Sequence, residues 1–105
     1  MDSKDFRLAA DRTIESLVRK LDALGIDDAD VDSSDGKLEI TFDDGTKFIV
    51  SRQSAANQLW LAEPAGGWHY NFTDGKWTCD KRGVGLLESL EALLAGKTGR
   101  PIRLS

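Results

Sequence analysis

Apolar residues recur at steps of three and four along the first segment of the chain. They are Phe6, Ala10, Ile14, Leu17, Leu21 and Leu24. This spacing places them on one face of a helix and therefore predicts an amphipathic helix. Ser3 is the expected N-terminal cap, and Gly25 stands just past the last apolar residue, where helices commonly end. The polar, aspartate-rich residues 26–36 that follow predict a loop.

From Leu38 onward the apolar period changes to two, which is typical of half-buried strands. Turns separate the strands of this region. The predicted strands cover residues 38–42, 47–51, 58–62, 68–72 and 76–79. Asp43-Asp44-Gly45 and Asp74-Gly75 are typical of tight hairpin turns, so neighbouring strands are expected to run antiparallel.

A second helix is predicted near the end of the chain, where leucines cluster from Leu86 to Leu94. The tail from Gly96 to Ser105 is expected to fold back onto the core through Ile102 and Leu104. This order of elements predicts an α+β fold, a two-layer sandwich. In it, an antiparallel sheet of five or six strands is covered on one face by an N-terminal and a C-terminal helix. Residues 1–105 are expected to form one domain.

Composition narrows the class of protein without changing this fold. Of the 105 residues, 40% are hydrophobic and 30% charged, which is an ordinary balance for a soluble chain. The single cysteine, Cys79, excludes an intramolecular disulfide and fits a reducing compartment. No apolar run approaches the length of a membrane span, and residues 1–5 resemble neither a signal nor a transit peptide. A cytoplasmic protein that does not bind membranes is therefore expected.

The distribution of charge is the strongest chemical signal in the sequence. The formal net charge of −4 argues against a nucleic-acid-binding surface. An acidic block runs from Asp22 to Asp44, with only Lys37 opposing it. Its acids are Asp22, Asp27, Asp28, Asp30, Asp32, Asp35, Glu39, Asp43 and Asp44. Crowded carboxylates attract hard cations and basic protein surfaces, although such a block is also compatible with a solvated loop that binds nothing.

An EF-hand calcium loop is excluded for these acids. Asp28, Asp30 and Asp32 have its ligand spacing, but Ser33 replaces the required glycine, and a strand pattern replaces the exiting helix. No set of nucleophile, base and acid is visible elsewhere, so no enzyme activity is expected. Cys79 is interpreted as a small buried residue, and His69, the single histidine, is not assigned to a metal.

Trp60 is a candidate anchor for a protein partner. If Leu59 and Leu61 point toward the helices, strand alternation places Trp60 on the open face of the sheet. Asn57 and Gln58 would flank it with hydrogen-bonding groups, and His69 is expected to share its face. Exposed aromatic side chains often dominate the binding energy of protein interfaces.

Several strings of residues resemble the frataxin family, in particular its bacterial members of the CyaY type. They are Leu38-Glu39-Ile40-Thr41-Phe42, Gly45-Thr46-Lys47, Arg52-Gln53, Asn57-Gln58-Leu59-Trp60-Leu61-Ala62, Gly66-Gly67-Trp68-His69-Tyr70 and Gly75-Lys76-Trp77. The resemblance covers roughly Phe6 to Leu94 in one order. It implies the fold predicted above, and a bacterial source.

The resemblance also implies an iron site on an acidic ridge. Ferrous or ferric iron would bind there weakly and exchangeably, and manganese, calcium and magnesium would compete. The positions that match the ridge are Asp22, Asp27, Asp28, Asp30, Asp32 and Asp35, with Asp11 and Glu15 as weaker extensions. Val18 and Arg19 depart from the family pattern, because many bacterial members carry two glutamates at these positions. Because of this departure, the part of the ridge that lies on the helix carries fewer carboxylates.

The partners implied by the resemblance are the cysteine desulfurase and the scaffold protein of iron–sulfur cluster assembly. A non-catalytic, iron-binding regulator or adaptor is expected, with the scaffold contacting Trp60, Asn57 and Gln58. A monomer is expected, and an oligomer formed on metal binding stays open. The alternatives are an iron-storage oligomer or chaperone with ferroxidase activity, and an acidic interaction domain that binds no metal.

Overall fold

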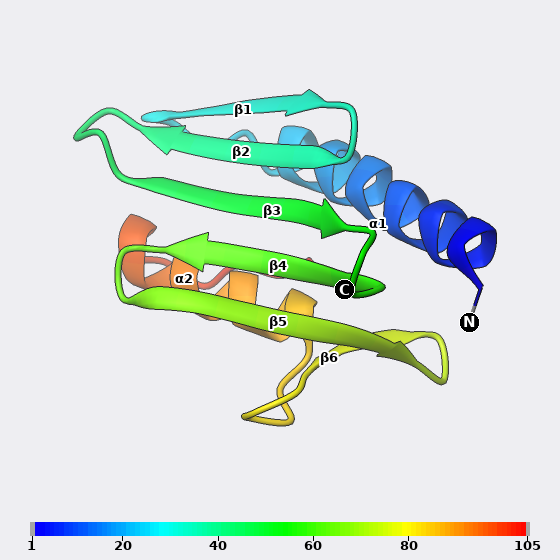
Figure 1. Cartoon of the computed structure of the whole chain (residues 1–105). Coiled ribbons are helices and arrows are strands. Elements are labelled where there is room, and N and C mark those ends of the chain that lie inside the picture. Colours follow the sequence, from blue (N-terminus) through cyan, green and yellow to red (C-terminus); the bar gives the residue numbers. More distant parts are fainter. Residues whose placement is uncertain (1, 105) are drawn as a thin grey trace.

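The computed structural model describes residues 2–104. Helices α1 (Ser3–Leu24) and α2 (Leu86–Thr98) lie on one face of a six-stranded antiparallel sheet whose strands follow the chain order (Figure 1). The strands are β1 (Ala29–Ser34), β2 (Lys37–Phe42), β3 (Lys47–Gln53), β4 (Gln58–Glu63), β5 (Gly66–Thr73) and β6 (Lys76–Cys79). The predicted two-layer α+β sandwich is confirmed. Within residues 2–104, neither helix has the length and apolar character that crossing a bilayer requires.

Both ends of α1 are fixed by local hydrogen bonds. Asp2, and not the predicted Ser3, is the N-terminal cap, since its Oδ1 accepts a hydrogen bond of 2.8 Å from the amide of Asp5. At the other end Gly25 adopts a left-handed conformation with φ of 58°, and its amide donates to the carbonyl of Asp22. This conformation suits glycine, which explains why the helix ends where predicted.

The core lies between the sheet and the helices, because the alternating apolar residues of each strand face α1 and α2. Its sheet residues are Leu38, Ile40, Phe42, Phe48, Val50, Leu59, Leu61, Tyr70, Trp77 and Cys79. Polar atoms within it have partners: Trp77 Nε1 donates to Thr13 Oγ1, and Tyr70 donates its hydroxyl to Ser89 Oγ, both at 2.8 Å. Buried polar groups without such partners would destabilise the fold. Cys79 is buried, as predicted.

Strand β1 lies within the segment that the sequence predicted to be a loop, so that prediction was wrong for residues 29–34. Ala29 and Val31 pack against the core, while Asp30 and Asp32 are exposed on the other face. Ala29 and Val31 are the only apolar residues that alternate with acids in this strand, so the period-two pattern is weak. Residues 29–34 become a strand because they pair with β2. This pairing satisfies backbone groups that β2 would otherwise expose.

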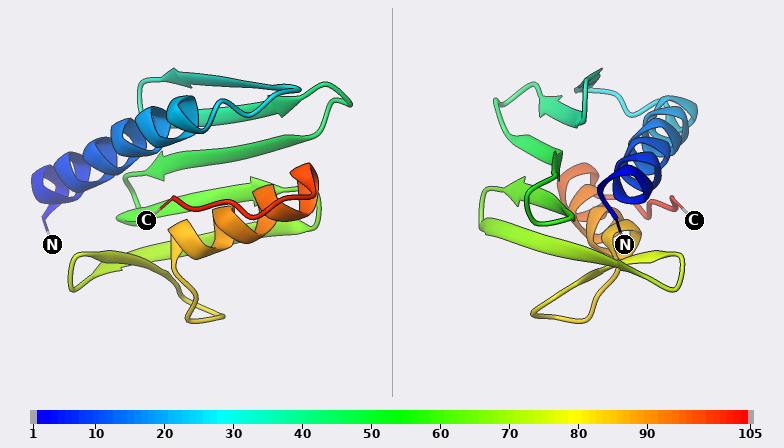
Figure 2. Two further views of the ribbon diagram at one scale, coloured as in Figure 1. Left: turned by 180° about the vertical axis from the view of Figure 1, so that it is seen from behind. Right: turned by 45° about the vertical axis from the view of Figure 1, so that its right-hand side comes forward.

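The C-terminal tail folds back as predicted, although α2 continues to Thr98, beyond the expected start of the tail at Gly96. The tail runs between the two helices (Figure 2). Ile102 and Leu104 are buried, and the amide of Leu104 donates to Glu91 Oε2 at 2.7 Å. The tail thus fills the gap between α1 and α2.

Replacing Leu104 with alanine is expected to lower the free energy of unfolding by about 2–4 kcal/mol, because a fully enclosed side chain is lost from the core. Urea unfolding followed by circular dichroism measures the change. Arg103→Ala is the matched control: its side chain is exposed, so the change should stay within about 0.5 kcal/mol. Equal losses in both variants would show that the tail does not stabilise the core through Leu104.

Candidate functional site

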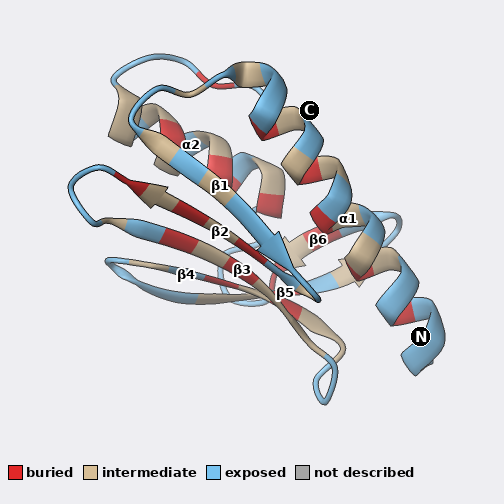
Figure 3. Cartoon of the chain, turned by 90° about the horizontal axis from the view of Figure 1, so that it is seen from above, coloured by how far each residue is buried: buried red, intermediate tan, exposed pale blue. Residues whose placement is uncertain are grey.

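The acidic block lies along the edge of the sheet at β1, with further acids on α1 and at the turn between β2 and β3. The edge strand is largely exposed on its outer side (Figure 3). The predicted metal ligands do not converge on one point. The structure separates all of them except Asp22 into three groups, which differ in how far neighbouring cations neutralise them.

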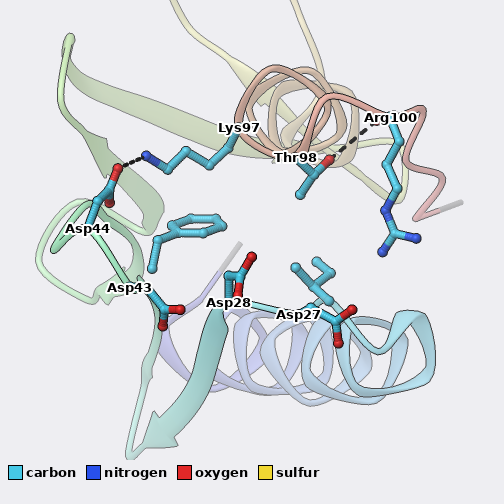
Figure 4. A pocket seen from close by; sticks show the side chains of 9 residues that line it. Asp27, Asp28, Asp43, Asp44, Lys97, Thr98 and Arg100 are labelled. Atoms are coloured by element: carbon cyan, nitrogen blue, oxygen red, sulfur yellow. Dashed lines mark hydrogen bonds and ion pairs between the residues drawn. The ribbon is translucent and has the colours of Figure 1, made fainter.

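The first group forms a groove at one end of the sheet, here named the carboxylate groove. Its acids are Asp27 and Asp28, before β1, and Asp43 and Asp44, in the turn after β2 (Figure 4). The backbone brings them together, because the amide of Asp43 donates to the carbonyl of Asp28 at 2.9 Å. Lys97 and Arg100, from the end of α2 and the residues after it, line the opposite wall of this cavity of about 640 Å³.

The four acids of the carboxylate groove have unlike electrostatic surroundings. Lys97 donates a hydrogen bond to Asp44, and the amide of Thr46 donates another, so the pKa of Asp44 lies well below its usual range. The pKa of Asp43 is raised, first by partial desolvation and then by the charge of Asp28 and a hydrogen bond between the two carboxyl groups. Asp43 and Asp28 are therefore a repelling pair, and no cation among residues 2–104 forms an ion pair with either acid.

The second group, Asp30 and Asp32, lies on the open face of the sheet and faces away from both helices. Asp32 is the cross-strand neighbour of Glu39. The carboxylate of Glu39 contacts Lys47 at 2.8 Å and Lys37 at 3.5 Å. The hydrogen bond and charge of Lys47, together with the charge of Lys37, lower the pKa of Glu39. These lysines offset part of the negative charge here.

The third group is tied to Arg52 of β3. Its guanidinium donates to Asp11 of α1 and, at 3.4 Å, to Asp35 of the turn between β1 and β2. Burial alone would lower the pKa of Arg52, but hydrogen bonding to Asp11 and its charge outweigh that effect and raise it. Glu15 lines the same groove between α1 and the β1–β2 hairpin, where Val18 and Arg19 also lie.

Asp22 belongs to none of the three groups and is exposed on the last turn of α1. Across residues 2–104, no three His, Cys, Asp or Glu side chains lie close enough to hold one metal ion together. The acidic edge therefore offers pairs of carboxylates whose remaining coordination positions would be filled by water.

Trp60 lies on the open face of the sheet, as predicted, with Leu59 and Leu61 buried on the other side. Its ring stacks on His69 of β5, with centroids 4.2 Å apart and an interplanar angle of 12°. Its Nε1 donates to Gln58 Oε1 at 2.9 Å. Stacking leaves Trp60 half-buried, so it is a pre-ordered aromatic surface and not a freely moving side chain.

Gln58 extends this open-face surface toward β5, since its Nε2 donates to Asn71 Oδ1 at 3.1 Å. Asn57 precedes β4 in a left-handed conformation with φ of 53°, which asparagine tolerates in turns. All three residues predicted to bind a partner thus lie at one end of β4.

Comparisons with known proteins agree with this fold. Residues 1–100 match the description of a frataxin-like domain. The chain is 41% identical over 104 residues to the "Iron-sulfur cluster assembly protein CyaY" of Thioalkalivibrio sulfidiphilus, an alignment that covers 94% of this chain and 95% of that protein. The chain belongs to the frataxin family.

Solved frataxin structures have the same fold. Frataxin from Psychromonas ingrahamii superposes with a TM-score of 0.93 at 30% identity, covering 100% of this chain and 99% of that one. A trimeric frataxin from the yeast Saccharomyces cerevisiae, solved in complex with ferrous iron, gives a TM-score of 0.78 at 23% identity, with 88% and 87% covered. The similarity to the yeast protein supports the fold alone.

Two acids of the groove, Asp43 and Asp44, were counted in the acidic block but were not assigned to the frataxin ridge. Their position depends on the pairing of β1 with β2, which places Ala29 opposite Phe42. Arg52 was also missed as the partner of Asp11 and Asp35. A prediction of β1 as a strand would have brought Asp28 and Asp43 together, because residues that flank paired positions are neighbours.

The two neighbouring acids of the turn are expected to have opposite effects on stability. The pKa of Asp43 is raised in the folded state, so its negative charge at pH 7 destabilises the fold. Because Asp43→Asn removes this charge, the substitution should raise the melting temperature at pH 7. The gain should disappear as the pH falls below the ordinary value of 3.8, where Asp43 is protonated in both states.

Asp44→Asn should lower the melting temperature at pH 7, because the pKa of Asp44 is depressed and its stabilisation is present above the ordinary value of 3.8. That loss should begin to shrink as the pH falls below the ordinary value of 3.8 toward the lower folded-state pKa. Thermal unfolding of both variants between pH 7 and pH 3 makes the comparison. A melting temperature lowered equally by the two substitutions at pH 7 would contradict the assignment of the repelling pair.

Proposed function

We propose that this frataxin homologue binds iron weakly and exchangeably on its acidic edge and serves iron–sulfur cluster assembly as a non-catalytic regulatory partner. The observation that carries the proposal is the Asp28–Asp43 pair, two acids brought together by the hydrogen bond from the Asp43 amide to the Asp28 carbonyl, with which no cation of residues 2–104 forms an ion pair. A bound cation would relieve their repulsion. The 41% identical relative is named for iron–sulfur cluster assembly, which supports the same role here.

The chemistry of the donors supports iron as cargo. Carboxylate oxygens are hard ligands that accept ferrous and ferric ions as well as manganese, calcium and magnesium. In the described chain, Asp27, Asp28 and Asp43 line one wall of an open groove without histidine or cysteine donors. An open site with few protein ligands and several waters binds weakly and exchanges readily, as delivery to another protein requires.

We assign the principal iron site to Asp28 and Asp43, with Asp27 beside them and Asp30 contributing negative charge. Asp11 and Asp35 are less suitable, because Arg52 neutralises them. Asp22, Asp32 and Glu15 extend the negative field of the edge. No general acid, base or nucleophile takes part, so the proposal includes no bond-making step and no ferroxidase reaction.

The same edge is proposed to dock onto a basic surface of the cysteine desulfurase, and the open face at Trp60 onto the scaffold protein. Opposed charged surfaces accelerate association and are screened by salt. Trp60 is held by His69 and Gln58, so it loses little conformational entropy on binding. The two surfaces are separate, and both partners can be bound together.

Ferrous iron added anaerobically and followed by NMR tests the metal site. In the wild type, amide signals of residues 27–30 and 42–45 should broaden first. Asp28→Asn/Asp43→Asn should weaken binding at least about tenfold, because the site loses both charged ligands. Asp74→Asn/Asp80→Asn is the matched control: it removes two exposed acids outside the block and should bind like the wild type.

Equal weakening in both double variants would assign iron binding to the overall charge and not to this pair. A silent carboxylate groove would refute the iron site and leave the acidic edge as a docking surface only. Calcium and magnesium titrations on the same samples test the expected poor selectivity.

Binding to purified desulfurase and scaffold separates the two docking surfaces. Trp60→Ala should weaken scaffold binding at least about tenfold, because central aromatic residues dominate interface energies, and should leave desulfurase binding unchanged. Asp28→Asn/Asp43→Asn should act in the opposite way, and desulfurase binding should fall as salt rises. Thr41→Ala, on the open face of β2, is the control. Loss of both partners in one variant would refute separate surfaces.

A further inference from the structure

Strand β1 is the outermost strand of the sheet, and one of its two sides is unpaired. Its only neighbour in the described chain is β2, which pairs with it along residues 29–34. No backbone group of these residues bonds to a backbone group outside β2 within residues 2–104. The opposite edge differs, because a bridge from Thr78 to Gly85 covers part of β6. The β1 side of the sheet therefore presents free backbone donors and acceptors (Figure 1).

The hydrogen bond from the Asp43 amide to the Asp28 carbonyl shows which backbone groups are free. Residues along an antiparallel strand turn their N–H and C=O groups alternately toward one neighbour and away from it. The residue before Asp43 donates its amide to the other side, toward the start of β3, as this alternation requires. Because Asp28 bonds toward β2, the groups that point away from the sheet belong to Ala29, Val31 and Ser33.

The side chains of β1 alternate between the two faces of the sheet in the same rhythm. Asp30 and Asp32 are exposed on the open face, and neither forms an ion pair within the described chain. Ala29 and Val31 are half-buried on the helix side. A strand added to this edge would place the two aspartates in non-hydrogen-bonded pairs, where facing Cα atoms are only about 4.5 Å apart. Every second side chain of that strand would therefore lie close to a carboxylate.

We propose that β1 accepts an extended segment of a partner protein as an additional antiparallel strand, with lysine or arginine at every second position. The backbone of the segment would bond to Ala29, Val31 and Ser33, and its basic side chains would meet Asp30 and Asp32. This inference rests on the proposed function, because it specifies how the acidic edge holds a basic partner. The backbone ladder supplies affinity, and the two-residue spacing of the acids supplies selectivity.

Charge excludes a second copy of the chain as the occupant. If β1 paired with β1 of another copy, Asp30 and Asp32 would meet the same acids, and like charges facing each other destabilise a sheet. Charged residues at edge strands commonly prevent such self-pairing. The two aspartates thus oppose association of identical edges and favour a basic segment.

The probe is a short synthetic peptide in which lysine alternates with threonine, titrated into the full chain and followed by NMR. Amides of residues 29–34 should shift. At saturating peptide, the amides of Ala29, Val31 and Ser33 should exchange more slowly with deuterated solvent, because they become hydrogen-bonded. A peptide of the same composition with its lysines in one block is the charge control. It should bind about fivefold more weakly, because it loses the spacing that matches the acids.

Two N-methylated versions of the alternating peptide test the backbone ladder. The first is methylated on the threonine amides, which would face β1, and the second on the lysine amides, which would face solvent. Only the first should bind at least about tenfold more weakly, because it loses its donors to β1. Equal loss with both versions would overturn the antiparallel register.

Variants of the protein separate the backbone from the charges. Ser33→Pro removes an outward amide and leaves the β1–β2 ladder intact, so the chain should fold and bind the peptide at least about fivefold more weakly. Ser33→Ala keeps the amide and should bind like the wild type. Asp30→Asn/Asp32→Asn should weaken binding about fivefold, whereas Asp74→Asn/Asp80→Asn, which removes two exposed acids elsewhere, should not. Thermal unfolding verifies that each variant is folded.

The outcomes distinguish this inference from the proposed function. Equal binding of the alternating and block peptides, or unchanged exchange at Ala29, Val31 and Ser33, would overturn strand addition and leave electrostatic docking intact. The same holds if purified desulfurase binds the wild type and Ser33→Pro equally while no peptide binds. If the alternating peptide binds as expected and the desulfurase does not bind, the docking proposal fails, and strand addition stands with another basic partner.

Discussion

The packing of the apolar stripe of α1 against the sheet is the constraint on which the rest of the arrangement depends. Phe6, Ile14, Leu17 and Leu21 are buried there, and the edge contact of Phe6 with Trp77, at 6.0 Å between centroids, anchors the helix near β6. Burial of such side chains contributes about 1.5–3 kcal/mol each and fixes the rotation of the helix about its axis. That rotation decides which charges face β1 and which face β6.

Negative charge is concentrated at one edge and only partly compensated. Arg52 ties Asp11 and Asp35 to β3, and Lys97 holds Asp44, so these acids support the fold. Asp28 and Asp43 form no ion pair with a cation in the described part of the chain, and their charges repel each other. A destabilising charge pair at an exposed position is typical of a functional site, because a protein optimised for stability alone would neutralise or separate the two acids. The least compensated acids are accordingly the best candidates for binding cargo.

The frataxin fold separates its surfaces by simple geometry. A sheet with helices on one face has an open face and two edges. Trp60 lies on the open face, and the acids lie at the β1 edge, where the outer backbone groups of the strand are unpaired within the described chain. Surfaces that face different directions allow several partners to bind one small protein without competing.

Local periodicity was enough to predict most of the fold. The 3.6-residue and two-residue patterns of apolar residues identified both helices, five of the six strands and the faces of Leu59 and Trp60, because alternation follows from backbone geometry alone. Gly25 marked the end of α1 for the same local reason. The family resemblance rested on strings of residues within these strands.

Only the tertiary structure decided β1, the partners of the acids and the grooves. A short polar edge strand becomes a strand by pairing with β2, and its register brings Asp28 to Asp43. The packing of β3 and α2 beside these strands brings Arg52 to Asp35 and Lys97 to Asp44. These pairs are far apart in sequence, so no local pattern records them. The sequence determined which residues are acidic, basic or apolar, whereas long-range packing decided which charges are neutralised and which stay free to bind.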